Sequence, residues 1–302
     1  MTEKYTNNKN VVALGKFDGL HVGHQKLLAA AIDTARQTGG VPIILFIGTP
    51  LSYLMTPSEA ENKAKELGIE KCVRYELTEE FRNMSGEDFV GKILFEELKC
   101  CHVVVGYNFR FSKNRSCSSE DLVRICNEYG MKCTVIDEIS VTESDGNVYS
   151  VSSSRIKELL MLGKVCEADK YLGHRYTLKG VVSHGKHLGT ELGFPTANII
   201  PENGRQLPGH GVYATAVMTD NCFYSGVTNV GTNPTVNSAD NITIETHIND
   251  FSQDIYGKEI SVCFIDKIRD EKKFSNVAEL TSQIEKDCYA SKQIFLKHFP
   301  KK

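Results

Sequence analysis

The stretch Val11–Leu28, VVALGKFDGLHVGHQKLL, joins a short apolar run, a glycine-containing loop and the start of a helical pattern. Its first four residues predict a buried strand, and GKFDG at 15–19 predicts a tight turn. From about His21 onward apolar residues recur at helical spacing, and Gly39-Gly40 ends the pattern. The apolar positions of this predicted helix are Leu27, Leu28, Ala31, Ile32 and Ala35. A strand–loop–helix unit is therefore expected.

Two histidines, His21 and His24, stand three residues apart at the start of that helix, on one face. Free backbone N–H groups and the positive end of the helix dipole make this a place for phosphate. Imidazoles there can donate hydrogen bonds to oxygens whose charge grows during attack at phosphorus, without a covalent step. Isolated histidines in this spacing more often cap a helix or lie in solvent. The strand, the loop and the amphipathic helix around them favour the phosphate site.

Length and composition narrow the class of protein. A chain of 302 residues can form two domains, and 41% hydrophobic with 24% charged residues is typical of a globular protein. The net charge of −3 and the lack of a basic tract do not indicate a nucleic-acid partner. No apolar run reaches membrane-spanning length, and the polar start MTEKYTNNKN does not resemble a signal peptide, so a cytoplasmic protein is expected.

The ten cysteines are scattered between Cys72 and Cys288 without a C-x-x-C pair. Zinc sites and redox dithiols need closely spaced ligands, so neither is indicated. Several cysteines stand in apolar runs, where a free thiol behaves as a small hydrophobic group. We expect reduced cysteines with mainly structural roles.

The first half of the chain alternates strand and helix patterns. The further strands are expected at Val41–Ile47, Cys101–Val105 and Lys132–Asp137, and the further helices at Glu59–Leu67, Ser85–Leu98, Asp121–Tyr129 and from about Val151 to Leu162. This alternation predicts an α/β domain with a parallel, doubly wound, Rossmann-like sheet. The G-x-G-x-x-G fingerprint is absent, so nicotinamide chemistry is not indicated.

The pattern changes near residue 172, where short β-rich runs with glycine turns replace helical spacing. Strands are expected at Thr177–Val182, Val212–Met218, Phe223–Val230, Ile242–Ile248 and Ile260–Ile268, followed by a helix at Asn276–His298. Short strands separated by turns predict an antiparallel β-barrel. The expected domains are therefore 1–172 and 173–302.

Three segments of the first half carry a family resemblance. KFDGLHVGH at 16–24, GYNFRF at 106–111 and VSSSR at 151–155 resemble the H-x-G-H nucleotidyltransferases, and within them the FMN adenylyltransferase half of prokaryotic riboflavin kinase/FAD synthetase. The resemblance implies that His21 and His24 are catalytic. It also implies nucleotide binding by Gly15, Phe17, Asp18, Gly19, Asn108, Ser153 and Arg155. For the serine cluster, a helix cap and a phosphate site are compatible, because both use the same helix N-terminus.

The chain departs from this family pattern at two loops. Phe46-Ile47-Gly48-Thr49-Pro50 stands where the family has F-D-P-H-P, and Ser112 and Cys117 replace two glycines. An acid and a histidine are therefore missing from the first loop. These departures are the sequence argument for a weak or inactive adenylyltransferase.

The second half carries the more specific resemblance, to riboflavin kinase. GVVSHGKHLG at 180–189 and LGFPTAN at 192–198 are followed by GVTNVGTNPT at 226–235 and IRDEKKF at 268–274. The resemblance implies nucleotide binding by Gly185, Lys186, Gly189, Pro195, Thr196 and Asn198, of which Thr196 and Asn198 would hold Mg²⁺. Oxygen ligands suit that cation. It also implies contact of Asn229 and Arg269 with flavin or, for the arginine, nucleotide.

Glu245 and His247 lie on one face of the strand expected at Ile242–Ile248, because side chains alternate along a strand. A strand glutamate chosen at random would be a solvated carboxylate. The resemblance instead makes Glu245 the catalytic base for the riboflavin hydroxyl, whereas His247 is expected to be structural.

Taken together, the resemblance implies a bifunctional enzyme that phosphorylates riboflavin to FMN with ATP and Mg²⁺, then adenylylates FMN to FAD with release of pyrophosphate. Two alternatives stay open at this point: a riboflavin kinase with a weak or inactive first domain, and a non-catalytic flavin-binding regulator. The sequence leaves the oligomeric state open.

Overall fold

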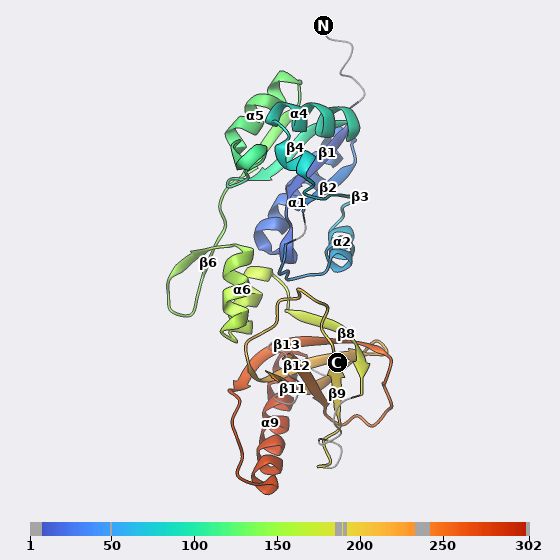
Figure 1. The fold of residues 1–302 in the computed structure, drawn as a ribbon, viewed down its shortest axis with the longest axis vertical. Helices are drawn as coiled ribbons and strands as arrows, with labels where there is room; N and C mark the ends of the chain where they lie inside the picture. Colours follow the sequence, from blue (N-terminus) through green and yellow to red (C-terminus); the bar gives the residue numbers. More distant parts are fainter. Residues whose placement is uncertain (1–7, 49, 185–188, 190–191, 233–241, 300–302) are drawn as a thin grey trace. The chain divides into compact units, whose positions relative to one another are not determined.

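The computed structural model describes residues 8–48, 50–184, 189, 192–232 and 242–299. The chain forms two compact units, Met1–Ser153 and Ser154–Lys302 (Figure 1). The helices α6 (Ser153–Met161) and α7 (Val165–Leu172) fall almost wholly in the second unit by this criterion. The division expected near residue 172 concerns functional domains, and it stays a prediction.

The first unit is built on a five-stranded parallel sheet in the order β3-β2-β1-β4-β5. Its strands are β1 (Asn10–Gly15), β2 (Pro42–Ile47), β3 (Lys71–Tyr75), β4 (Cys100–Gly106) and β5 (Lys132–Ile136). The strand order reverses between β1 and β4, which confirms the doubly wound sheet and marks the edge where such folds bind ligands. Only β3 was absent from the sequence prediction, because charged residues interrupt its short apolar run.

Helices cover both faces of this sheet (Figure 1). They are α1 (Val22–Thr38), α2 (Pro57–Glu66), α3 (Glu79–Asn83), α4 (Gly86–Asp88) with the π-helix Phe89–Glu97, and α5 (Ser119–Glu128). The predicted helix at Ser85–Leu98 is therefore π-helical over most of its length, as the bond from the Leu98 N–H to the Ile93 carbonyl (2.9 Å) shows. Apolar spacing does not distinguish a π-helix from an α-helix over so short a segment.

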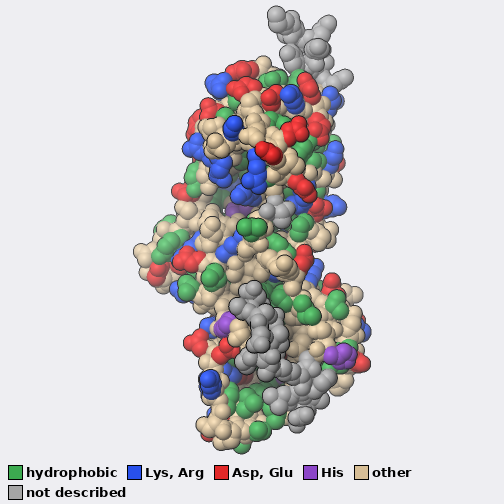
Figure 2. Space-filling view, viewed as in Figure 1, with side chains coloured by type: hydrophobic (Ala, Val, Ile, Leu, Met, Phe, Trp, Pro, Cys, Tyr) green, Lys and Arg blue, Asp and Glu red, His purple; other side chains and the backbone are tan. Residues whose placement is uncertain are grey.

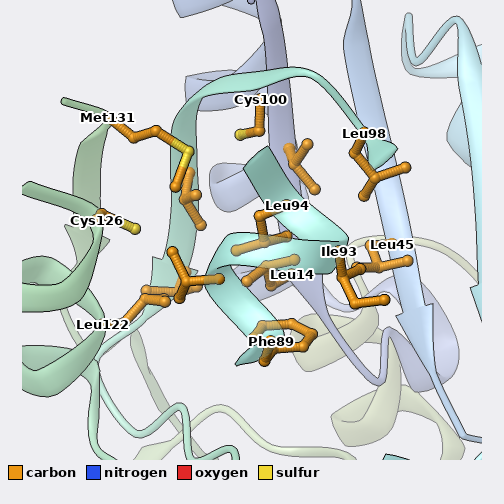
Figure 3. Packing of buried hydrophobic residues seen from close by; sticks show 14 of the residues in the cluster. Leu14, Leu45, Phe89, Ile93, Leu94, Leu98, Cys100, Leu122, Cys126 and Met131 are labelled. Atoms are coloured by element: carbon orange, nitrogen blue, oxygen red, sulfur yellow. The ribbon is translucent and has the colours of Figure 1, made fainter. Parts of the chain in front are cut away.

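Alternate residues of each central strand pack into two apolar layers. Leu14 and Leu45 lie in the layer beneath the π-helix and α5, together with Phe89, Leu94 and Leu122 (Figure 3). The intervening strand residues pack on the other face with α1, whose buried residues are the five that the helical spacing selects. A small hairpin, β6 (Ser140–Thr142) and β7 (Val148–Ser150), follows β5.

The second unit contains a closed antiparallel barrel in the order β10-β11-β12-β9-β8-β13. Its strands are β8 (Thr177–Ser183), β9 (Thr196–Ile199), β10 (Gly211–Thr219), β11 (Cys222–Thr232), β12 (Ile242–Ile248) and β13 (Glu259–Arg269). The terminal helix α9 (Val277–His298) is capped by Asn276 and packs on β10, β11 and β13. The barrel and the helix confirm the prediction, whereas β9 was expected only as a motif and α7 was not expected.

On the face shown in Figure 2, acidic and basic side chains are interspersed rather than gathered into one patch. All ten cysteines are unpaired thiols. Within the described residues no helix is long and apolar enough to cross a membrane, and no three acidic, histidine or cysteine side chains cluster as a metal site.

Candidate active sites

The two histidines of H-V-G-H lie against each other at the start of α1. Their ring centroids are 3.6 Å apart and their planes differ by 14°. His21 is the N-cap of the helix, and its Nδ1 accepts a hydrogen bond from the His24 backbone N–H at 3.3 Å. The same imidazole therefore satisfies one of the unpaired N–H groups at the helix start.

This contact determines the chemical state of His21. Because Nδ1 accepts, the proton of the neutral ring is on Nε2, which leaves a donor for an incoming oxyanion. Burial lowers the pKa of His21 to about 4, although a hydrogen bond to the backbone opposes the shift. Burial, and then the charge of His21, lowers the pKa of His24 well below its ordinary value. Both histidines are therefore neutral hydrogen-bond donors at pH 7, not cations.

The stacking of the two histidines explains why a glycine, Gly23, stands between them. A Cβ atom there would lie 3.2 Å from two atoms of the His21 ring, closer than ordinary packing allows. Behind the pair, the ring of Phe17 lies 5.1 Å from that of His24, and the ring of Phe46 lies 5.7 Å from that of Phe17. Phe17 is 1% exposed, so it supports the histidines rather than presenting its ring to solvent.

The loop between β1 and α1 is held by two long-range hydrogen bonds. The Asp18 carboxylate accepts the Leu54 N–H at 2.6 Å, and the Asp18 carbonyl accepts the Ser153 hydroxyl at 3.0 Å. The structure thus brings together the predicted residues Asp18 and Ser153, 135 positions apart. Gly15 and Gly19 lie in the same loop, which therefore forms a pre-organised rim beside the histidines.

Two other residues predicted for this site, Asn108 and Arg155, lie on other elements of the chain. Asn108 is exposed just beyond the carboxyl end of β4, at the reversal point of the sheet. Arg155 lies on α6 in the second unit, where its guanidinium donates to Glu158 at 2.7 Å.

Ser112, which replaces a family glycine, has φ 69° and ψ 179°. That region is almost confined to glycine and costs on the order of 1–3 kcal/mol for other residues. The Ser112 hydroxyl donates to the Met84 carbonyl at 3.1 Å, which offsets part of that cost. The loop therefore keeps a glycine-like backbone without the glycine.

In the second unit, the predicted polar residues form a row across three strands. Asn198 of β9 lies directly opposite Glu245 of β12, and Glu245 lies directly opposite Asn229 of β11. Directly opposed residues point to the same face, with Cβ atoms about 5 Å apart. All three are half-buried. The row thus places a carboxylate between two carboxamides.

The side chains inside the barrel show that this row lies on the outer face of the barrel. The residues between the row positions point inward, and the buried hydroxyls of Thr228 and Thr246 hydrogen-bond to each other at 2.9 Å. Thr228 also bonds to Thr215 of β10 at 2.9 Å. Because side chains alternate along a strand, Glu245 and Asn229 must point away from this interior.

The P-T-A-N segment lies beside the row. Thr196 is opposite His247, whose Nδ1 donates to the Pro195 carbonyl at 2.9 Å. This contact agrees with the structural role expected for His247. Gly189 lies against the same segment, where a Cβ atom would meet the Phe194 carbonyl oxygen at 2.5 Å. Gly185 and Lys186 lie outside the described residues.

Arg269 continues the row, through Val212, on β13. Its guanidinium forms a two-pronged ion pair with Asp287 of α9, with nitrogen–oxygen distances of 2.8 to 3.2 Å. Asp287 is 2% exposed, and the guanidinium also lies 5.8 Å from the Phe274 ring centroid. Its contacts within the described residues are therefore with α9 and the following turn. The predicted flavin contact stays a prediction.

A hollow of about 640 Å³ opens next to Pro195. Phe194, His247 and Phe251 contribute rings to its wall, and α9 contributes Cys288 and Lys292. Lys292 is bonded to Asp250 at 2.8 Å, which ties the helix to the turn after β12. The sequence analysis did not identify this wall, because its residues come from three separate segments. Gly23, Phe46 and Leu54 were likewise missed, although Gly23 and Phe46 lie within segments that the sequence comparison with the family covers.

A histidine pair at a helix start on a parallel sheet and a polar row on a closed barrel are the arrangement expected of a two-unit enzyme that transfers phosphoryl groups. A family model described as FAD synthetase matches residues 3–154, and one described as riboflavin kinase matches residues 172–295. The chain belongs to the bifunctional riboflavin kinase/FMN adenylyltransferase family.

The similar proteins span nearly the whole chain. It is 33% identical to a bifunctional riboflavin kinase/FMN adenylyltransferase of Bacillus subtilis strain 168, over 92% of this chain and 90% of that protein. It is 31% identical to the protein of the same description from Escherichia coli K12, over 94% and 92%. A crystal structure described as a macrolide-efflux protein from Streptococcus pneumoniae superposes with a TM-score of 0.84 and 28% identity, covering 95% of each chain.

Proposed function

We propose that the barrel unit phosphorylates riboflavin to FMN and that the sheet unit then adenylylates FMN to FAD, with ATP as donor in both steps. The function as a whole follows from membership of the family. The roles of single residues are our proposal, and the observation that carries them is the Asn198–Glu245–Asn229 row.

In the kinase step, Glu245 accepts the proton of the terminal ribityl hydroxyl while that oxygen attacks the γ-phosphorus of ATP. The cross-strand pairing puts the Cβ atoms of Glu245 and Asn198 about 5 Å apart, close enough for one substrate group to contact both side chains. Asn229, on the other side of Glu245, can orient the hydroxyl. Arg269 lies one strand beyond Val212, and we assign it to the flavin side.

Magnesium fits the P-T-A-N segment. Thr196 and Asn198 point to the same face of β9, and the Asn198 Nδ2 donates to the Thr196 carbonyl at 3.5 Å, which directs the amide oxygen elsewhere. One or two protein oxygens completed by water and phosphate are typical of Mg²⁺. When bound, the ion would neutralise charge on the ATP phosphates. Thr196 and Asn198 would hold it.

The hollow beside Pro195 can receive the adenine of the kinase ATP. Its wall presents the rings of Phe194, His247 and Phe251, and it adjoins the segment that would hold the phosphates. Gly189 itself lies close to Phe194 of this wall.

In the adenylyl transfer, the phosphate of FMN attacks the α-phosphorus of ATP, and pyrophosphate leaves. His21 and His24 donate hydrogen bonds to the oxygens on which charge develops, and both are held neutral by burial. Ser153 keeps the serine segment against the loop that carries Asp18. Ser153, Arg155 and Asn108 are assigned to phosphate and substrate contact on the family resemblance.

A second candidate is a riboflavin kinase whose adenylyl transfer is weak. The glycine-like backbone of Ser112 favours it, since strain in that loop would oppose closure over a nucleotide. The intact histidine pair opposes it.

One experiment separates these functions. Purified protein receives ATP and Mg²⁺ with riboflavin in one tube and FMN in another, and the products are separated by chromatography. FMN followed by FAD from riboflavin, and FAD from FMN, is the expected result. FMN alone would establish the weak-transferase candidate, and binding without any product would establish the flavin-binding regulator.

A further inference from the structure

A second, smaller hollow lies in the first unit at the carboxyl ends of β1, β2 and β3. Lys16, Phe17, Asp18, Phe46 and Arg74 form part of its wall. Its volume of about 20 Å³ is little more than one water molecule needs, so it admits an oxygen atom rather than a ring. The adenylyl-transfer mechanism above uses neither of its two cations.

Arg74 occupies a specific position in this wall. It pairs with Phe46 across β3 and β2, and its guanidinium carbon lies 4.4 Å from the Phe46 ring centroid. The Phe46 ring contacts Phe17, and Phe17 contacts His24. A continuous line of ring contacts therefore joins Arg74 to the histidine pair.

The contacts of Arg74 leave some N–H donors of its guanidinium available to a ligand. Its side chain is 25% exposed, Phe46 takes one face of the guanidinium, and Glu61 accepts from Nη2 at 3.2 Å. A guanidinium has five N–H donors, and a planar fork suits phosphate. An ion pair this exposed contributes at most about 1 kcal/mol, so stability alone is a weak reason for an arginine here.

Two cations at this edge can contact an anion. The segment after β2, residues 48–55 (GTPLSYLM), contains no lysine, arginine or histidine. Lys16 is exposed and makes no ion pair with any described residue, and Arg74 is the other cation of the hollow. The Asp18 carboxylate is already bonded to the Leu54 N–H. The carboxylates of Asp18 and Glu61 balance the charges of Lys16 and Arg74, so the hydrogen-bond donors of the two cations, rather than a net positive charge, are what an anion would contact here.

We propose that Arg74 binds a phosphate oxyanion of the adenylyl-transfer substrates and sets affinity for that substrate. The inference rests on the proposed function of this unit. The oxyanion belongs either to ATP or to FMN, and both present the same chemistry to the guanidinium.

The test compares Arg74→Gln with the wild-type protein in FAD synthesis from FMN, with ATP and FMN varied in turn. We expect the KM for one of the two substrates to rise roughly tenfold to a hundredfold, the loss typical of a charge-assisted hydrogen bond, with kcat changed less than about threefold. The substrate whose KM rises identifies the source of the oxyanion. FMN formation from riboflavin by the same preparation is the internal control and should not change.

Glu61→Gln is the matched control, because it removes the ion-pair partner and leaves the cation. An unchanged KM in this variant and a raised KM in Arg74→Gln support the proposal. Unchanged KM values for both substrates in Arg74→Gln, or equal losses in the two variants, would overturn it.

Arg74→Met keeps an apolar stem over Phe46 without the charge, and it replaces the glutamine variant if that one is unfolded. If the wild-type protein makes no FAD at all, the proposed function fails, and calorimetric titration of ATP and FMN into wild type and variant still tests Arg74. Weaker binding of one ligand in the variant would support the role, and equal binding of both would exclude it.

Discussion

The two candidate sites are built in different ways. The histidine pair is enclosed: His21 is 7% exposed, its ring stacks on that of His24, and aromatic rings close the site from behind. The kinase row lies half-buried on the outer face of a barrel, where strand pairing alone sets the spacing of its three polar residues. The first site thus depends on packing for its chemistry, and the second depends on β-sheet register.

The largest expected effect is the loss of one of the two reactions while the other continues. Glu245→Gln removes the base and should abolish FMN formation from riboflavin, while FAD formation from FMN continues at the wild-type rate. The measurement is product chromatography with each substrate. Glu259→Gln, an exposed carboxylate on β13, is the matched control. Equal loss of both reactions would show that the sites are not separate.

The converse change is His24→Ala. Loss of one donor to the developing charge should slow FAD formation from FMN by about a hundredfold or more, and FMN formation from riboflavin should stay unchanged. The initial rates of both reactions, measured on one preparation, show whether only FAD formation is slowed. A wild-type rate of FAD formation would remove His24 from the site.

The terminal helix is tied to the barrel by the ion pair between Arg269 of β13 and the buried Asp287 of α9. Asp287→Ala leaves Arg269 mostly buried without its partner and should lower the free energy of unfolding of the second unit by about 3 kcal/mol. Chemical denaturation followed by barrel-specific activity measures this. Asp250→Asn is the control, because its pair with Lys292 is exposed and should contribute at most about 1 kcal/mol. Similar losses in the two variants would contradict the distinction.

The smallest expected effect concerns pH. Because the pKa of His21 is about 4 in the folded chain and 6.5 in the unfolded chain, the unfolded state binds more protons between these values. His21 therefore contributes its full stability above pH 6.5, and that contribution decreases as the pH falls toward 4. At pH 5 His21 alone should cost the first unit about 2 kcal/mol, and His24, whose pKa is also lowered by burial, adds to that loss.

Calorimetry at pH 7 and pH 5 should show this loss in the melting transition of the first unit. The variant His21→Gln has no proton to gain and should show a smaller shift. An identical shift in the variant would assign the pH dependence to other groups.

Much of the fold could be predicted because its signals are local. The apolar spacing of α1, its glycine terminus, and the alternation in β12 each reflect how neighbouring residues share a face. The edge strand β3 was missed because Arg74 and Lys71 interrupt its pattern, and the edge of a sheet tolerates such residues. The segment at 165–172 was missed because a short amphipathic helix carries little signal.

The candidate sites were predicted in part for the same reason. Glu245 and His247 could be placed on one face of their strand from alternation, and His21 and His24 on one helix face from spacing. Asp18 was expected to bind nucleotide, whereas its carboxylate in the structure accepts the Leu54 N–H, a contact between distant segments that periodicity cannot show.

The sequence by itself thus determined most of the strands and helices along the chain, the helix start that carries the histidines and which residues of β12 share a face. These follow from backbone geometry, which acts over a few residues. The tertiary structure alone decided that the histidines are neutral, that Asn198, Glu245 and Asn229 share a row, and that Asp287 holds Arg269. Each of these depends on burial or pairing between residues far apart in the chain, where local periodicity carries no information.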